Sequence, residues 1–472
     1  MTQPSAGRRA IVLVDGEHYP EVVRAALAHL SASGTVPAAA LFLGGTEKVD
    51  AHGVAVDVGA PIQWVPRRAG AVFDLDAAAA ALRELITTLQ PDVVVDLSDE
   101  PILDHRRRLQ LASHALLAGV AYEGPDFRLV PPPMPALADV PSIAVVGTGK
   151  RTGKTAVAGE LVRCLRSAGR KPVVVAMGRG GPAEPVVVPA GAALGIDALL
   201  AVADAGGHAA SDFYEDAIST GAAAVGARRC GGGLAGAVGY SNVAEAVGIA
   251  NGMGGDLLVL EGSGAALPPV RADATVLIVP GDCDPEFLSG YLGPYRVLLA
   301  DLVVVTMCES PRSSPAQVEA VLGAIRSISR RTPVLCTVLR PAPLGAITGE
   351  RVLFATTAPD AVASTLAAML ETDHGCDVVA TSSHLADRPA LRADLASAPA
   401  FDVLLVEVKA AAVDVAARVA ADRGARVVFC DNRPIVIDVD PTDEQAEGDQ
   451  VLTFKDAVER LAGLASERFA AR

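Results

Sequence analysis

Short apolar runs alternate with longer segments of helical periodicity along the first part of the chain. Strand-like runs occur in RAIVLVDG, AAALFLGG and PDVVVDLSDE, and a shorter one contains Trp64. The segments PEVVRAALAHL, DLDAAAAALRELITTL and RRRLQLASHALLAGV carry apolar residues at helical spacing. Continuous apolar strands with helices between them are typical of a parallel sheet. We therefore expect residues 1–130 to form a Rossmann-like α/β domain.

A proline-rich segment, residues 131–141, predicts a stiff linker after this first block. Apolar runs then resume in SIAVVG, KPVVVAMG, DLLVLEG, ATVLIVPG, DLVVVTM and PVLCTVL, and they predict a second parallel sheet over residues 142–345. The runs RVLFA, DVVATS, DVLLVEV and RVVFC predict a C-terminal α/β extension over residues 346–472, packed on the second block. The last apolar periodicity, in FKDAVERLAGLASERF, predicts a docked terminal helix.

The segment SIAVVGTGKRTGKTAV, residues 142–157, carries the strongest chemical signal. It reads as a strand, a glycine-rich loop and the start of a helix, which is the order found in nucleotide phosphate loops. The usual pattern places its first glycine where Thr148 stands, and here that glycine is one residue earlier, at Gly147. In such a loop Lys154 reaches the nucleotide phosphates and the Thr155 hydroxyl ligates Mg²⁺. The predicted nucleotide-binding residues are Gly147, Thr148, Gly149, Lys150, Arg151, Thr152, Gly153, Lys154 and Thr155.

A second signal is the run DLLVLEGSG, in which a buried strand ends at Glu261. Ligands bind at the carboxyl ends of strands in open α/β sheets, and a carboxylate there can hold Mg²⁺ together with Thr155. Arg179 lies in MGRGGP, and Arg228 and Arg229 lie in GARRCGGG. Because glycines surround the arginines in both segments, we expect these arginines on loops, where guanidinium groups suit phosphate oxygens. We expect Lys154, Lys150, Glu261 and the three arginines to be catalytic, with the arginines also holding a phosphorylated substrate.

Other polar groups also follow predicted strands. In the first block Asp15, Glu17 and His18 follow one strand, and Asp96, Asp99 and Glu100 follow another, so His18 is a candidate substrate contact. Lys409, near the start of a predicted helix, is a second candidate contact to a phosphate. Asp212 and Asp216 share a helical face, either as metal ligands or a base, or as a solvated acidic surface.

Composition limits the possible partners of this chain. The formal net charge is −15 over 472 residues, which argues against nonspecific nucleic-acid binding. No apolar run has the length of a membrane span and no secretory signal is evident, so we expect no membrane association. None of the seven cysteines forms a C-x-x-C pair, which favours reduced thiols and a cytoplasmic location.

The loop GTGKRTGKT resembles that of dethiobiotin synthetase and its relatives, and the chain as a whole resembles the cyclic 2,3-diphosphoglycerate synthetase family. The resemblance runs through DGEHY, GGTEK, DLSDEP, GPDF, GTGKRTGKTAV, VVAMGRGGP, ARRCGGG, EGSGAALPPV, LADLVVVTMCE, LFATTAP, GCDVV, KAAAVDVAARVA and CDNRP. It implies a phosphate-loop NTPase-like (dethiobiotin-synthetase-like) domain and a ligase that uses ATP and Mg²⁺. The implied reaction closes 2,3-diphosphoglycerate into an intramolecular phosphoanhydride. Proteins with this class of loop often dimerise across the nucleotide, so we expect a homodimer.

Two other functions are open at this point. A kinase or ligase of the same loop class could act on another phosphorylated acid, such as 2-phosphoglycerate. A nucleotide-switch ATPase could instead act on a protein partner, although such proteins usually carry metal-binding histidine or cysteine tracts or a membrane-binding helix, and the chain has neither.

Overall fold

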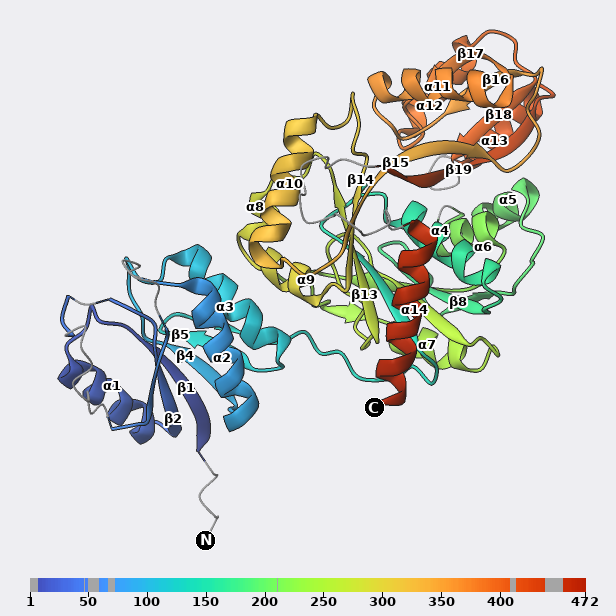
Figure 1. The fold of residues 1–472 in the computed structure, drawn as a ribbon. Helices are drawn as coiled ribbons and strands as arrows, with labels where there is room; N and C mark the ends of the chain where they lie inside the picture. The colour runs from blue at the N-terminus through green and yellow to red at the C-terminus, as the bar shows by residue number, and fades with distance from the viewer. Residues whose placement is uncertain are drawn as a thin grey trace. The chain divides into compact units, whose positions relative to one another are not determined.

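The computed structural model describes residues 7–45, 47–49, 59–66, 73–209, 211–407, 413–437 and 453–472 (Figure 1). The chain divides into two compact units. The first comprises Met1–Pro132, Asp284–Leu299 and Ala324–Arg330, and the second comprises Pro133–Cys283, Ala300–Gly323 and Arg331–Arg472.

The first unit is a six-stranded sheet in the order β3-β2-β1-β4-β5-β6. Its pairs are parallel except for the β5–β6 hairpin. The apolar residues of the central strand β1 are almost completely buried, as expected for a strand covered on both faces. The strands are β1 (Arg8–Val14), β2 (Thr35–Phe42), β3 (Ile62–Trp64), β4 (Val93–Asp96), β5 (Ala121–Gly124) and β6 (Phe127–Leu129). The helices are α1 (Pro20–Ala32), α2 (Leu75–Leu89), α3 (His105–Leu117), α8 (Glu286–Ser289) and α9 (Gly293–Leu299).

The second unit contains one long sheet in the order β11-β10-β8-β12-β7-β13-β14-β15-β19-β18-β16-β17, with β9 paired to β10. The strands are β7 (Ser142–Gly147), β8 (Pro172–Gly178), β9 (Val186–Val188), β10 (Ala223–Cys230), β11 (Tyr240–Ser241), β12 (Leu257–Glu261), β13 (Ala274–Pro280), β14 (Leu302–Thr306), β15 (Val334–Pro343), β16 (Arg351–Ala355), β17 (Asp377–Ser382), β18 (Val403–Glu407) and β19 (Arg426–Ile437). Its helices are α4 (Lys154–Ser167), α5 (Ile196–Asp204), α6 (Asp212–Thr220), α7 (Val243–Asn251), α11 (Asp360–His374), α12 (Arg388–Ser397), α13 (Val413–Asp422) and α14 (Phe454–Ala470), and α10 (Pro315–Ile328) divides between the two units. The α/β class and the parallel phosphate-loop sheet predicted from the sequence are confirmed.

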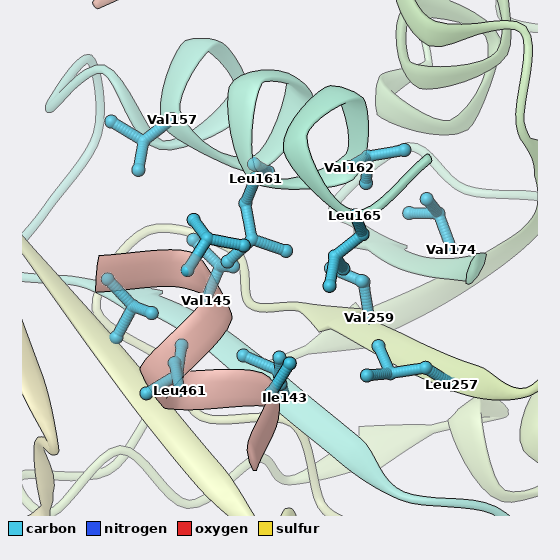
Figure 2. Packing of buried hydrophobic residues seen from close by; sticks show 14 of the residues in the cluster. Ile143, Val145, Val157, Leu161, Val162, Leu165, Val174, Leu257, Val259 and Leu461 are labelled. Carbon is cyan, nitrogen blue, oxygen red and sulfur yellow. The ribbon is translucent and has the colours of Figure 1, made fainter. Parts of the chain in front are cut away.

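The phosphate-loop strand β7 lies within this sheet, paired in parallel with β12 and β13. Ile143 and Val145 on β7 pack with Leu161 and Leu165 of α4, and Leu461 of α14 belongs to the same buried cluster (Figure 2). α14 therefore forms part of the phosphate-loop core, as its apolar periodicity predicts. Its first turn is closed by a capping box between Thr453 and Asp456, which satisfies amide donors at the helix start.

The C-terminal extension continues the same sheet. The connection is an antiparallel pairing of β15 with β19, in which Cys336 faces Ile437 and Pro343 faces Cys430. The sequence predicted a parallel sheet for residues 142–345 and no strand direction for the extension. The pair that joins them is antiparallel because β19 returns the chain from the extension to the phosphate-loop block. Within the described residues, none of the helices combines the length and apolarity that a membrane crossing requires.

Candidate nucleotide and anion site

The phosphate loop is shaped by glycines at its two ends. β7 ends at Gly147, and a Cβ built there would lie 2.9 Å from Cδ of Lys154, which is too close for a side chain. A larger residue at position 147 would therefore displace the Lys154 side chain. Gly153, the residue before α4, has a φ of 83° in the left-handed region that glycine adopts freely. Arg151 has a φ of 61° and adopts the same left-handed conformation, which is strained for a residue with a side chain.

The loop is also held from a neighbouring strand. Thr306, the last residue of β14, donates a hydrogen bond of 2.7 Å from its hydroxyl to the carbonyl oxygen of Thr152. Both residues are buried. The loop backbone therefore has a defined shape, with α4 starting directly behind it. An α-helix start presents free N–H groups, a suitable environment for phosphate oxygens.

Lys154 and Thr155 lie in the first turn of α4, and both are buried. The Lys154 ammonium lies 3.4 Å from the carbonyl oxygen of Gly149, so its side chain folds back along the loop. The Thr155 hydroxyl donates to Oε1 of Glu261 at 3.1 Å. Glu261 ends β12, in register with Val145 of β7, and the sequence predicted this meeting at the strand ends. Lys150 and Arg151, at the tip of the loop, are exposed.

Two arginines converge on the turn that follows Glu261. Arg229 donates to the carbonyl oxygens of Ser263 and Gly231, each at 2.7 Å. Gly264 has a φ of 62°, and a Cβ there would collide with Nη2 of Arg179 and lie 3.3 Å from Nη2 of Arg229. Burial, and then the positive charge of Arg179, lower the pKa of Arg229. Two like charges held together at a strand end form an environment that favours an anion.

The expectation that Arg228 and Arg229 lie on a loop was wrong. Both belong to β10, which pairs with β8 on one side and, at Arg229, with Ser241 of β11. Pairing with strands on both sides imposes an extended backbone on a sequence of low strand propensity. The Arg228 guanidinium lies 5.8 Å from the centre of the Tyr240 ring. Arg179 does lie in a turn, directly after β8.

The sequence named three further candidates, His18, Asp216 and Lys409. In the first unit His18 contacts Oδ1 of Asp15 at 2.8 Å and Oδ2 of Asp99 at 3.2 Å, so its ring is held by two carboxylates. Asp216 on α6 is buried, so the prediction that it belongs to a solvated acidic surface was wrong. Lys409 lies outside the described residues. Among the residues that the structure describes, no group of three or more histidine, cysteine, aspartate or glutamate side chains could hold a metal ion.

The sequence did not indicate the cavity beside the loop. It has a volume of about 220 Å³ and is lined by Gly153 and Ala156 as well as by residues of the C-terminal extension. The available signal was positional, because Met307 directly follows β14 and Glu407 is the last residue of β18.

Three family models match the chain in sequence order. They are the N-terminal domain (residues 9–130), the P-loop domain (residues 142–338) and the C-terminal domain (residues 343–433) of cyclic 2,3-diphosphoglycerate synthetase. The P-loop domain implies a nucleotide as ligand.

Curated relatives extend the comparison over nearly the full length. A protein of Rubrobacter xylanophilus named cyclic 2,3-diphosphoglycerate synthetase is 45% identical, covering 92% of this chain and 95% of its own. A protein of the same name from Methanothermus fervidus is 42% identical, covering 91% of this chain and 94% of its own. A solved structure of the hydrogenase maturation factor HypB from Archaeoglobus fulgidus has a TM-score of 0.28 at 15% identity over 42% of this chain and 81% of its own, a similarity too low to support an argument. The domain models and the extent of the identity show that the chain belongs to the cyclic 2,3-diphosphoglycerate synthetase family.

Proposed function

We propose that this chain is an ATP-dependent ligase that closes 2,3-diphosphoglycerate to cyclic 2,3-diphosphoglycerate, with release of ADP and phosphate. Its relatives carry the name of that synthetase. The observation that carries the proposal is the turn from Glu261 to Gly264. Glu261 at its start contacts Thr155 of the phosphate loop, and Gly264 at its end lies against Arg179 and Arg229. The proposed nucleotide site and the proposed anion site would thus share one turn.

ATP would be held by the loop from Gly147 to Thr155. The glycines at both ends of the loop support this assignment. Gly147 lies close to Lys154 and Gly153 is left-handed, and glycine lets the backbone approach a ligand closely. Thr155 and Glu261 supply two oxygen atoms, and Mg²⁺ typically takes one or two protein oxygens together with phosphate oxygens and water. When bound, the ion would neutralise charge on the phosphates. Lys150 and Arg151, both exposed, would contact the phosphates of the nucleotide in their own chain or in a neighbouring subunit.

The diphosphoglycerate would be held by Arg179, Arg228 and Arg229. His18, in the first unit, and Lys409 are separate proposals for contacts to the substrate. Arginine suits this role because its planar guanidinium pairs with two phosphate oxygens at once. The buried Nε atom of Arg228 and that of Arg229 have no hydrogen-bond partner. Anion binding would compensate the cost of placing these charges at a partly buried strand end.

The reaction takes place in two steps. An oxygen of one substrate phosphate attacks the γ-phosphorus of ATP, and the bond from that phosphorus to the β–γ bridging oxygen breaks to release ADP. An oxygen of the second substrate phosphate then attacks the phosphorus of the first substrate phosphate. The bond from that phosphorus to the oxygen of the transferred phosphate breaks. The P–O–P ring forms and inorganic phosphate leaves. Since every species is anionic, the task of Lys154, Glu261 and the arginines is positioning and charge neutralisation.

The test is ³¹P NMR of the protein mixed with ATP, Mg²⁺ and 2,3-diphosphoglycerate. We expect a new cyclic pyrophosphate signal to grow with those of ADP and inorganic phosphate. ATP consumption without that signal would refute the proposed reaction. Replacing the substrate with 2-phosphoglycerate is the control, because this molecule has a single phosphate and cannot form the ring.

The active form would be a cytoplasmic homodimer. The seven cysteines carry free thiols, which supports a reducing compartment. Light scattering during size-exclusion chromatography measures the mass of the protein directly. A monomeric mass both with and without nucleotide would contradict the proposed dimer.

A further inference from the structure

The cavity beside the phosphate loop has one apolar side. Gly153 and Ala156 contribute to its lining from the loop and α4, and Val362, Leu366 and Met369 contribute from α11. These α11 residues are spaced three and four apart, so they share one face of the helix. The apolar side therefore belongs to the C-terminal extension, while the loop side belongs to the phosphate-loop block.

The charges around the cavity disfavour a phosphate-rich ligand. The ionisable lining residues are Glu215, Glu309, Glu407 and Asp431 against Arg151 and Arg312. Arg312 and Asp431 already have an ionic partner within the protein, at 3.0 Å and 2.7 Å, and Glu309 pairs with Arg340. Glu215 and Glu407 against Arg151 leave an excess of negative charge. An excess of carboxylates repels polyanions such as diphosphoglycerate. An uncharged ring with neutral hydroxyl groups fits a site of this composition.

The polar end of the cavity is rigid. Glu407, the last residue of β18, accepts hydrogen bonds from the hydroxyls of Thr356 and Thr357, from the Thr357 amide, and from Nδ2 of Asn432, at 2.9–3.0 Å. The carboxylate is thus oriented by three neighbouring residues from different segments. Pre-oriented polar groups next to an apolar side are typical of small-ligand sites.

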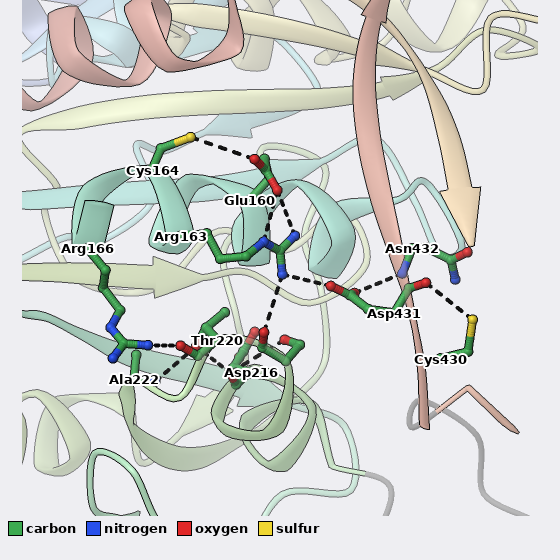
Figure 3. Close-up of polar contacts among 11 residues, drawn as sticks. Glu160, Arg163, Cys164, Arg166, Asp216, Thr220, Ala222, Cys430, Asp431 and Asn432 are labelled. Carbon is green, nitrogen blue, oxygen red and sulfur yellow. Dashed lines mark hydrogen bonds and ion pairs between the residues drawn. The ribbon is translucent and has the colours of Figure 1, made fainter. Parts of the chain in front are cut away.

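The extension is tied to the helix that follows the phosphate loop. Arg163 of α4 donates from Nη1 to Oδ2 of Asp431 on β19 at 2.7 Å, and it also bonds Glu160 (Figure 3). Oδ1 of Asp431 accepts the amide of Asn432 at 2.8 Å. The side chains of Arg163 and Asp431 are 17% and 7% exposed, so solvent screens this pair weakly. This ion pair holds Asp431, which lines the cavity, against the helix that follows the phosphate loop.

We propose that this cavity binds the adenosine part of the nucleotide, and that the C-terminal extension completes the site. The inference rests on the proposed use of ATP. The base packs between Ala156 and the apolar face of α11, and the polar end of the cavity receives the hydroxyl groups. The extension, which holds none of the phosphate-loop residues, thereby becomes the part of the chain that distinguishes a nucleotide from a bare polyphosphate.

The test is calorimetric binding of Mg²⁺-ADP and of Mg²⁺-tripolyphosphate to the full chain. Met369→Trp places a larger side chain in the cavity, and Ala368→Trp places the same side chain at the adjacent exposed position of α11. We expect Met369→Trp to weaken ADP binding at least tenfold and to leave tripolyphosphate binding unchanged. Ala368→Trp is expected to bind both ligands like the unmodified protein. Lys154→Ala is expected to weaken both.

Equal loss of both ligands in a folded Met369→Trp protein, or no loss of ADP, would overturn the assignment. Tripolyphosphate binding shows in the same experiment that the variant has folded around its loop. The smaller change Val362→Phe tests the same apolar side of the cavity. Diphosphoglycerate is absent from these titrations, so a failure to form the cyclic product would not affect their outcome.

Discussion

Arg229 allows the proposed anion site to be tested by removing one charge. Its pKa is lowered first by burial and then by Arg179, so the folded protein disfavours the charged form. Replacing Arg229 with glutamine removes this repulsion and keeps a side-chain amide that can donate to the carbonyl oxygen of Ser263 or Gly231. We therefore expect Arg229→Gln to melt at the same temperature as the unmodified protein or at a higher one.

The same change should weaken substrate binding. A hydrogen bond to a charged group contributes about 1.5–3 kcal/mol, so one guanidinium–phosphate contact corresponds to a change of roughly 10- to 150-fold in Kd. Calorimetric titration with 2,3-diphosphoglycerate and, separately, with Mg²⁺-ADP measures the two affinities. We expect the first to fall within that range and the second to stay within about twofold, an outcome typical of residues kept for function at a cost to stability.

Arg170→Gln is the matched control. Arg170 precedes β8, at the opposite end of the strand from Arg179, and pairs with Asp256 at 3.2 Å. It carries the same charge but lies at the amino end of the sheet, so its removal should change neither affinity. An unchanged diphosphoglycerate affinity in Arg229→Gln, or an equal loss of ADP affinity, would refute the assignment of Arg229 to the substrate.

Three further changes test other parts of the structure. Lys154→Ala should abolish ATP turnover and leave the circular dichroism spectrum and melting temperature within error; product formation at the normal rate would remove the loop from the mechanism. Leu461→Ala should destabilise the second unit by about 2–5 kcal/mol because it empties a buried position of the phosphate-loop core, a loss visible in urea unfolding by circular dichroism but not in Trp64 fluorescence. Burial, and then the nearby charge of Arg83, lower the pKa of His114 in the first unit from 6.5 to about 4. The neutral His114 ring therefore makes its full contribution to the free energy of unfolding above pH 6.5. This contribution, about 3 kcal/mol, is lost as the pH falls towards 4. Trp64, the single tryptophan, reports this loss, and His114→Leu should remove it.

The contact between Thr155 and Glu261 could be predicted from the sequence because both residues are placed by local rules. A strand-loop-helix pattern fixes Thr155 at a helix start, and the carboxyl ends of parallel strands meet at one edge of the sheet. β10 could not be predicted in the same way. Its sequence AAVGARRC is rich in residues of low strand propensity, and its extended form depends on pairing with β8, β9 and β11. Gly226 shows this dependence, because a Cβ there would collide with the Phe213 ring from α6.

The cavity wall could not be predicted because it depends on strand pairing between distant parts of the chain. β15 and β19 both read as ordinary apolar strands, and no local pattern distinguishes parallel from antiparallel pairing between them. Once β19 pairs with β15, Asp431 meets Arg163 on α4, and the extension is positioned beside the loop. Helix α11 then contributes its apolar face to the cavity.

The turn from Glu261 to Gly264 would join the proposed nucleotide site to the proposed anion site. At one end the Gly262 amide donates to the carbonyl oxygen of Val145 at 2.9 Å, which fixes the turn to the phosphate-loop strand. At the other end Arg229 bonds the Ser263 carbonyl oxygen. A Cβ at Gly262 would lie 2.8 Å from the carbonyl oxygen of Ala266, so a side chain there requires the turn to move. Gly264 has a φ of 62°, in the left-handed region that other residues adopt only at a cost. Because phosphoryl transfer requires donor and acceptor to be held in line, a short rigid connection between the two sites limits errors in their alignment. Any change that moves this turn should therefore affect turnover more than it affects the binding of either ligand alone.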